Sequence, residues 1–288
     1  MLLRLPPRRI EPERLDDADV PPGERAAAYR GLDRLQRLSR TALRLVRAAQ
    51  PAMQDKIVHG ERIKWVDLAC GSGRVLCDAA DSAARFYAMG LEAIGVDFSE
   101  ASLAIARGNA ERSCQAVSWV HADLIADPFP VACRRADVIS CSLFLHHLQD
   151  DEIVGLLRRA AANCRVLVVD DLRRSRRGYW LAQLAGRVVT RSPIVHADGA
   201  KSVRAALRPE ELRDLADAAG LTDATITTQW PQRMLLVNDR GPDALTIAAG
   251  ESTTIQLPAD DDTAIETVSH AGRGADAEPA AKPAERSQ

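Results

Sequence analysis

Several features that mark particular classes of protein are missing from this sequence of 288 residues. No apolar run is long enough to cross a bilayer, and the first residues lack the apolar stretch of a secretory signal. The six cysteines are scattered without any C-x-x-C pair, which argues against structural zinc and a disulfide framework. We therefore expect a cytoplasmic protein, and its hydrophobic fraction of 46% is typical of a globular one.

Lysine is scarce, since only four of the 38 basic residues are lysines, and no aromatic residue follows Trp230. The net charge of −2 combines unlike parts, because the last 38 residues carry a net charge of −5 and the remainder carries +3. A near-neutral total argues against a general nucleic-acid binder. The composition predicts an irregular segment and helical cap over 1–55, a globular domain over 56–240 and a disordered acidic tail over 241–288.

Leucine and arginine recur with a helical period between residues 24 and 49. The leucines gather on one side and the arginines on the other, which predicts an amphipathic helix with a break near Ser39. We expect the leucine face to dock on the chain's own domain. The alternative is that this basic helix makes a peripheral contact with a membrane surface.

From residue 63 onward, apolar runs typical of strands alternate with helical patterns. The expected strands cover 63–69, 93–96, 117–121, 136–142 and 165–169, and the expected helices cover 74–89, 100–112 and 150–162. This order predicts a parallel sheet with right-handed crossovers and helices on both faces.

The rhythm changes after residue 171. We expect a helix over 179–190, a long connection over 191–207, a helix over 210–219 and two closely spaced strands over 224–230 and 233–237. Strands so close in sequence can pair only as an antiparallel hairpin. The predicted fold is therefore a doubly wound α/β fold with a mostly parallel, seven-stranded sheet that ends in this hairpin.

The segment from Asp67 to Gly73, with the sequence DLACGSG, joins the first predicted strand to the first predicted helix. Its glycines allow a sharp turn and a close approach of a ligand to the main chain, and the helix start offers free N–H groups. The dinucleotide fingerprint G-x-G-x-x-G fails, because its third glycine would fall on Leu76. An acidic residue at this strand end suits a cationic amino group.

Two further acidic residues follow the next two strands. Asp97, which Phe98 follows, can accept hydrogen bonds from both hydroxyls of a ribose. Asp123 can accept from an adenine amino group while Leu124 flanks the ring. Because the carboxyl ends of parallel strands share one edge of the sheet, these acids together predict a nucleotide cofactor at that edge.

With these motifs and the run 136–148, residues 56–238 resemble the class I S-adenosylmethionine-dependent methyltransferases. The resemblance implies S-adenosyl-L-methionine as the cofactor and assigns roles along the chain. Asp67 and the Ala69 backbone would hold the methionine amino group, and Gly71 and Gly73 would permit close approach of the cofactor. Asp97 would bind the ribose, and Phe98 would be a further cofactor-binding residue. Asp123 and Leu124 would bind the adenine, and Ser142 would lie beside the methionyl portion. Ala69 departs from the family, which usually has glycine there, and its methyl group tightens the loop.

His146 and His147 follow the fourth strand, near the expected position of the transferred methyl group. Either could act as a general base if the acceptor is a hydroxyl, and the pair could equally be a structural start to the next segment. Consecutive helical residues point roughly 100° apart, so we expect at most one of them to face the pocket. Asp171, after the fifth strand, could orient such a base. No metal-ligand spacing stands out, so we predict no metal.

The arginines that follow the fifth strand, between residues 173 and 177, are expected to form a solvated loop with one or two salt bridges, and the alternative is that they bind an anionic substrate or polyanion. Tyr179, Trp180 and the segment 191–207 lie where the resembling family inserts structure that covers the substrate, and they suggest an apolar lid. The resulting hypothesis is methyl transfer to a small, fairly apolar acceptor, above all O-methylation of a phenolic, polyketide-like or quinone-like metabolite. The alternatives are a protein or RNA methyltransferase and a non-catalytic cofactor-binding partner subunit, and the oligomeric state stays open.

Overall fold

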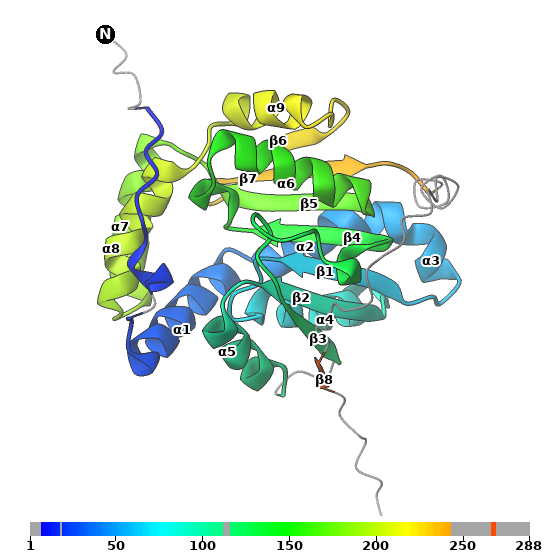
Figure 1. The fold of residues 1–288 in the computed structure, drawn as a ribbon, viewed down its shortest axis with the longest axis horizontal. Coiled ribbons are helices and arrows are strands. Elements are labelled where there is room, and N and C mark those ends of the chain that lie inside the picture. Colours follow the sequence, from blue (N-terminus) through cyan, green and yellow to red (C-terminus); the bar gives the residue numbers. More distant parts are fainter. Residues whose placement is uncertain (1–6, 18, 112–115, 243–265, 269–288) are drawn as a thin grey trace, which may run out of the picture.

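Seven strands form the sheet that the sequence predicts, and an eighth extends it (Figure 1). The computed structural model describes residues 7–17, 19–111, 116–242 and 266–268. The strands are β1 (Ile63–Leu68), β2 (Leu91–Asp97), β3 (Val117–His121), β4 (Ala136–Ser142), β5 (Cys164–Leu172), β6 (Thr225–Gln229), β7 (Arg233–Asp239) and β8 (Glu266–Val268). Their order is β6-β7-β5-β4-β1-β2-β3-β8, with β6, β7 and β8 antiparallel to their neighbours. The predicted mostly parallel sheet with a C-terminal antiparallel hairpin is confirmed.

The eighth strand falls within the segment 241–288, for which the composition predicts disorder. Residues 266–268 pair antiparallel with β3 and cover its outer edge. The rest of the predicted tail beyond residue 242 lies outside the described residues.

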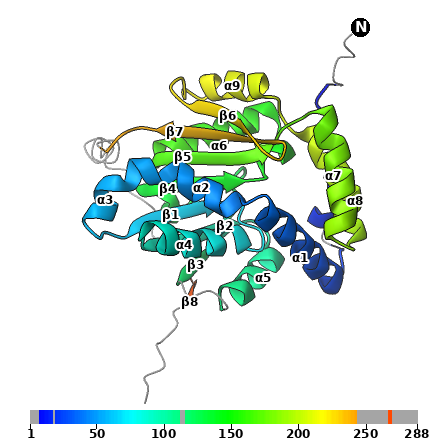
Figure 2. The ribbon, with the colours of Figure 1, turned by 180° about the vertical axis from the view of Figure 1, so that it is seen from behind.

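Helices cover both faces of the sheet, as Figures 1 and 2 show from opposite sides. The helices are α1 (Pro22–Leu38), α2 (Thr41–Ala49), α3 (Gln54–Val58), α4 (Arg74–Tyr87), α5 (Glu100–Ala110), α6 (Asp150–Ala162), α7 (Arg176–Val189), α8 (Pro193–Ala205) and α9 (Pro209–Ala218). Helices α2, α4 and α5 pack on one face and α6 and α9 on the other. The alternation of strand side chains explains both layers, because Trp65 of β1 packs into the first and Val66 into the second.

The amphipathic N-terminal segment is divided into α1 and α2, which confirms the predicted break near Ser39. Arg40 between them has a left-handed φ of 54°, which no helix interior allows. The leucine face docks inward, since Leu45 is buried on the sheet and Leu32 and Leu35 pack in a cluster with α8. Helices α1, α7 and α8 stand together at the left edge of the molecule in Figure 1.

The long connection predicted over 191–207 is wrong, because this segment contains helix α8. Its hydrophobic pattern is weak, and it contains alanines and Gly199 in place of large apolar residues. Helix α8 is instead stabilised by a local N-cap and by packing against the rest of the domain. The Ser192 hydroxyl accepts a hydrogen bond from the Val195 N–H, Pro193 occupies the first turn, and Ile194 and Val195 are buried.

The arginine run after β5 contains a salt bridge, as predicted, but Arg174 is buried and the end of the run lies in α7 instead of a loop. Arg174 is buried and paired with Glu211, and Arg173 donates to the Gln232 side chain. Arg176 and Arg177 are exposed at the start of α7. Among the described residues, no helix is both long and apolar enough to cross a membrane.

The buried Trp119 ring packs against two glycines that have no room for a side chain. A methyl group on Gly95 would lie 2.4 Å from a Trp119 ring carbon and 2.9 Å from Cys70 Sγ. We therefore expect Gly95→Ala to lower the free energy of unfolding by about 1–3 kcal/mol, the usual cost of overpacking. Urea unfolding followed by circular dichroism measures this.

The matched control is Gly108→Ala in α5, where an added methyl group meets nothing within 4 Å. This change should leave the free energy of unfolding unchanged or raise it by up to about 1 kcal/mol, because alanine is the better helix former. Equal effects of the two substitutions would contradict the packing argument.

Candidate active site

A cavity of about 740 Å³ lies at the carboxyl ends of β1, β2 and β4. Its floor consists of the loops that follow these strands, and α1, α7, α8 and the N-terminal segment 7–17 cover it. The predicted site residues that line it are Ala69, Gly71, Asp97, Phe98, Ser142, His146 and His147. Asp67, Gly73, Asp123, Leu124 and Asp171 do not line it.

The loop after β1 has the sharp turn that its glycines predict. Ala69, Gly71 and Gly73 all have positive φ, at 52°, 54° and 65°. Ala69 thus adopts a backbone conformation that glycine enters without cost, which explains why glycine is usual there. Gly73 lies behind the loop, where a methyl group would come within 2.2 Å of the Trp119 ring. Its lack of a side chain therefore serves internal packing in this structure.

Asp97 at the end of β2 is almost completely buried, yet it faces the cavity. Its Oδ2 accepts a hydrogen bond from the Gly71 N–H at 2.7 Å, and its Oδ1 accepts from the Ser99 N–H at 2.9 Å. Burial raises the pKa of this carboxyl group, and the two backbone donors oppose that rise. Each oxygen keeps a lone pair for a further donor. The geometry suits the predicted contact with ribose hydroxyls.

The two predicted adenine contacts, Asp123 and Leu124, do not line the cavity. Asp123 closes its own turn, because its Oδ1 accepts from the N–H groups of Ile125 and Ala126. Leu124 is buried in the core beside α6. Their contacts with adenine therefore stay predictions.

Asp67 is only 1% exposed and bonds within the sheet. Its Oδ1 accepts a hydrogen bond from the Ser140 hydroxyl at 2.6 Å, and the Trp65 indole N–H donates to Ser140 in turn. Burial raises the pKa of Asp67 to about 7, although the Ser140 hydrogen bond opposes the rise. Its predicted role toward the methionine amino group stays a prediction.

His146 and Asp171 form a buried pair at the ends of β4 and β5. His146 Nδ1 lies 2.7 Å from Asp171 Oδ1, and the His146 backbone N–H donates to the other carboxylate oxygen. Burial alone would raise the pKa of Asp171, but the imidazole and the hydrogen bonds from His146 and Leu172 hold it below its usual value. A carboxylate at Nδ1 selects the tautomer with the proton on Nδ1, which leaves the Nε2 lone pair free.

Both histidines line the cavity, so the expectation that at most one would face it is wrong. They lie in a short 3₁₀ turn, Leu145–His147, and their rings are only 4.4 Å apart. The N-terminal segment supplies a carboxylate to each ring. Glu13 Oε1 is 3.8 Å from His146 Nε2, and Asp16 Oδ2 is 3.5 Å from His147 Nδ1. Burial lowers the pKa of His147, but these acids outweigh it and raise the pKa above its usual value.

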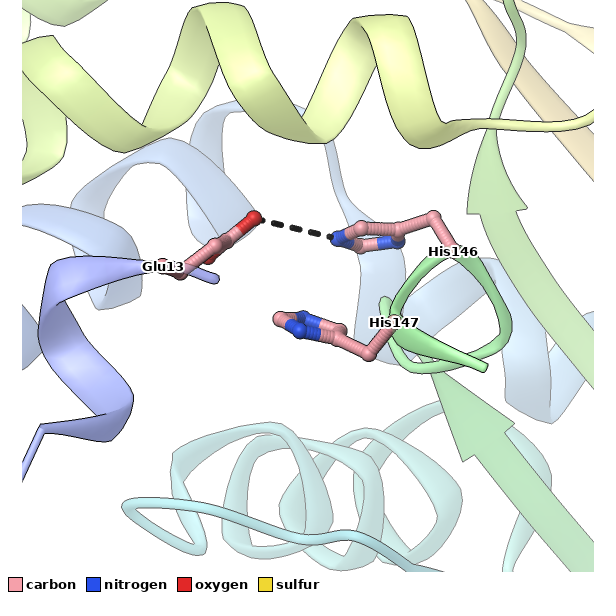
Figure 3. A group of neighbouring side chains, drawn as sticks. All are labelled: Glu13, His146 and His147. Atoms are coloured by element: carbon pink, nitrogen blue, oxygen red, sulfur yellow. Dashed lines mark ion pairs between the residues drawn. The ribbon is translucent and has the colours of Figure 1, made fainter. Parts of the chain in front are cut away.

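Figure 3 shows Glu13 pointing toward the two imidazole rings, although more than a hundred residues separate them in sequence. The segment that carries Glu13 is anchored at several points. Arg8 donates to the carbonyl oxygens of Leu145 and Leu148, and the Asp198 carboxylate accepts from two backbone N–H groups, those of residues 14 and 15. The composition of residues 1–55 gave no sign of this role, since proline and charge suggest only an irregular segment.

Tyr29 of α1 is a second residue that the sequence reasoning missed. Its hydroxyl lies 2.6 Å from the Ser102 hydroxyl, and its ring is the nearest group to a methyl group built on Gly71. Burial raises the pKa of this phenol, which therefore stays protonated at neutral pH. The helical period of α1 shows that Tyr29 shares a face with Leu32, but not that this face covers a cavity.

Glu13, His146 and His147 are also residue types that bind divalent metals. Their potential ligand atoms lie within 4.8 Å of one another. Glu13 Oε1 and His146 Nε2, 3.8 Å apart, are close enough to bind either one metal ion or one hydrogen-bond donor. We interpret Glu13, His146 and His147 as hydrogen-bonding partners of the molecule that receives the methyl group. Adding a chelator before the assay should therefore leave any methyl-transfer activity unchanged.

The buried Asp67 carboxyl group gives a prediction for stability. An unfolded aspartate has a pKa of about 3.9, so a folded pKa of about 7 means that stability is fully present below pH 4 and is lost as the pH rises toward 7. Asp67→Asn keeps an oxygen for the Ser140 hydroxyl and removes this loss. Without cofactor, the variant should gain on the order of a few kcal/mol over the unchanged protein between pH 4 and pH 7.5.

Urea unfolding at a series of pH values measures that difference. Asp123→Asn is the control, because Asp123 lies in an open turn where its side chain bonds backbone N–H groups. A difference between Asp67→Asn and the unchanged protein that does not vary with pH would contradict the raised pKa.

The chain resembles known proteins in its domain family and in its fold. Residues 66–166 match the family model of a methyltransferase domain. No curated protein matches the sequence. The fold is similar to human N-acetylserotonin methyltransferase in complex with S-adenosylmethionine, with a TM-score of 0.53 and 20% identity over 77% of this chain and 57% of that one.

Two further structures have similar folds. The S-adenosylmethionine-dependent methyltransferase SibL gives a TM-score of 0.51 at 16% identity, over 74% of this chain and 57% of that one. The plantazolicin methyltransferase BpumL, with a triazolic substrate analog and S-adenosylhomocysteine, gives 0.51 at 14% identity, over 76% of this chain and 97% of that one. The chain thus spans little more than half the length of SibL and the human enzyme. With its sheet order, its glycine-containing loop and its family match, the chain carries a class I S-adenosylmethionine-dependent methyltransferase domain.

Proposed function

We propose that the protein transfers the methyl group of S-adenosylmethionine to an oxygen of a small, fairly apolar acceptor, with His146 as the general base. The observation that carries this proposal is the buried His146–Asp171 pair, whose free imidazole nitrogen lies in the same cavity as Asp97. A phenolic, polyketide-like or quinone-like acceptor fits a cavity with apolar walls. Such walls come from Leu181, Ala182 and Ala185 of α7 and from Ile194 and Val195 of α8.

The residues present fit the cofactor. Gly71 faces the cavity beside Tyr29, and a side chain there would occupy the space in which a ligand can reach the main chain. The buried Asp97 carboxylate still has lone pairs for ribose hydroxyls. When bound, S-adenosylmethionine supplies a methyl group that its sulfonium has already activated. The task of the protein is then to orient the acceptor and to remove its proton.

In this proposal, His146 Nε2 accepts the proton of the acceptor hydroxyl. Asp171 holds the Nδ1 proton in place and stabilises the imidazolium that forms, because its lowered pKa keeps it ionised. Glu13, 3.8 Å from Nε2, can hold the acceptor's hydroxyl or a second donor group next to the imidazole. Helices α1, α7 and α8 shield the site from water, which strengthens these electrostatic contacts.

The macromolecular alternatives find less support. A polyanion such as RNA would meet Glu13, Asp16, Asp33, Asp97 and Asp198 on the cavity wall. Within the arginine run after β5, Arg173 and Arg174 bond to side chains of the domain. A cavity of about 740 Å³ lies within the size range of small-molecule sites.

Removing the base tests the mechanism. His146→Gln should lower kcat for methyl transfer by about 10²- to 10⁴-fold, the usual contribution of a positioned base, while the affinity for S-adenosylmethionine stays the same. The assay follows label from the cofactor into acceptors of a metabolite extract, which also identifies the acceptor. His147→Gln is the matched control and should lower kcat far less. A His146→Gln variant with unchanged kcat would refute the assignment.

Cofactor binding is tested separately by calorimetry with S-adenosylmethionine. Asp97→Ala removes the carboxylate that would accept hydrogen bonds from the ribose hydroxyls, so it should weaken S-adenosylmethionine binding by about 10- to 100-fold. Asp97→Asn, which keeps one acceptor oxygen, should lose less. An unchanged affinity in Asp97→Ala would contradict the ribose assignment.

A further inference from the structure

The outer side of helix α7 carries an uncovered apolar stripe, defined as Trp180, Leu184 and Val188. Their exposed fractions are 71%, 63% and 75%, which are large for residues of this size and polarity. Because they are spaced four residues apart in a helix, they lie above one another on one side of it. Figure 1 shows α7 at the edge of the molecule, next to α8.

The opposite side of α7 is already in use. Gly178 and Gly186 are buried there, and Ala182 and Ala185 line the cavity. Helices α1 and α8 contact α7 from the inside of the molecule. Nothing among the described residues covers the stripe, so its exposure is not a by-product of how α7 packs.

The charge around the stripe has one sign. Between residues 172 and 197 the chain has six arginines and neither aspartate nor glutamate. Arg176, Arg177, Arg187 and Arg191 are exposed. At 100° per residue, Arg177 and Arg187 project within about 80° of Leu184 in the middle of the stripe. The outer side of α7 therefore combines large apolar side chains with arginines and has no acidic residue.

We propose that this side of α7 docks the protein on an anionic lipid bilayer. The stripe would enter the boundary between headgroups and acyl chains, and the flanking arginines would bind lipid phosphates. A second copy of the chain fits less well, because a two-fold contact through the stripe would bring the arginines of both copies together. The leucine face of α1 is turned inward, which leaves only Leu38 strongly exposed, so the membrane contact considered for the N-terminal helix belongs to α7.

Leu181 connects this surface to the site. It is 38% exposed and also lines the cavity, so the cavity rim lies beside the stripe. If the acceptor is as apolar as the proposed function holds, it can pass from the bilayer along α7 to His146. That route rests on the proposed function, whereas binding to the bilayer does not.

The test is co-sedimentation of the full chain with phosphatidylcholine vesicles that contain or lack phosphatidylglycerol. We expect binding only to the vesicles with phosphatidylglycerol and weaker binding as salt is added. The triple variant Trp180→Ser, Leu184→Ser, Val188→Ser should bind at least about tenfold less. Arg177→Glu with Arg187→Glu should also lose more than about tenfold, because each arginine near an anionic surface contributes about a factor of five.

Phe86→Ser is the matched control, because Phe86 is 58% exposed on α4 and lies outside the stripe. It should bind vesicles like the unchanged chain. All stripe variants should keep their affinity for S-adenosylmethionine in calorimetry, since Trp180, Leu184 and Val188 do not line the cavity. That measurement shows that they are folded and separates this proposal from the proposed function.

Two results would overturn the proposal. One is equal sedimentation of the triple variant and the unchanged chain with anionic vesicles, or no binding by either at low salt. The other is a dimer in analytical ultracentrifugation that the triple variant loses, without any vesicle binding, because the stripe would then be covered by a second copy.

Discussion

The candidate active site depends on one buried interaction, the hydrogen bond between Asp171 and His146. A carboxylate without solvent is costly unless charged or polar groups surround it, and Asp171 has the imidazole and two backbone N–H groups around its two oxygens. The pair connects the end of β5 to the turn after β4, so it fixes the imidazole relative to the sheet. Because the cavity floor follows the same strand ends, the free nitrogen of His146 is held at a constant position above it.

The roof of the cavity is assembled from two segments that lie far apart in sequence. Residues 7–38 and 176–205 meet in a small cluster where Leu15 and Ala28 pack on Ile194 and Val195. Polar contacts complete it, since Arg25 donates to the carbonyl oxygens of Leu15 and Asp17. This cluster is much smaller than the two layers on the sheet, so the roof is the part of the domain that can open at least cost. A domain that must admit an acceptor and then exclude water needs such a division.

The first seven strands could be predicted from the sequence because each has a local apolar pattern, whereas β8 lies in a segment whose composition predicts disorder. The bounds expected for β3, β4 and α6 agree with the structure, since alternating or continuous apolar runs end at clear polar positions. Helix α8 could not be predicted, because Ser192 and Pro193 start it but its alanines and Gly199 give little period. Its stability comes from contacts with α7, α1 and the N-terminal segment, of which the last two lie far away in sequence.

For the candidate site, too, only the residues at strand ends could be predicted from the sequence. Asp97, Ser142 and His146 follow from strand ends, because a parallel sheet brings those ends to one edge. Glu13 and Asp16 reach the histidines only through the path of the N-terminal segment, which depends on Arg8 and Asp198. The predicted contact of Asp123 with adenine stays a prediction, since in this structure its carboxylate accepts hydrogen bonds within its own turn.

In helix α7 the sizes of the apolar side chains are distributed in the reverse of the usual way. A helix that covers a core ordinarily turns its large apolar residues inward, since burying a leucine contributes about 1.5–3 kcal/mol. Here the positions that line the cavity are Gly178, Ala182, Ala185, Gly186 and the half-exposed Leu181, whereas Trp180, Leu184 and Val188 point outward. Small residues on the inside leave volume for a ligand, so the inner side is explained by the cavity. The outer side has no comparable contact among the described residues, and this exposure is the observation on which the proposed docking surface rests.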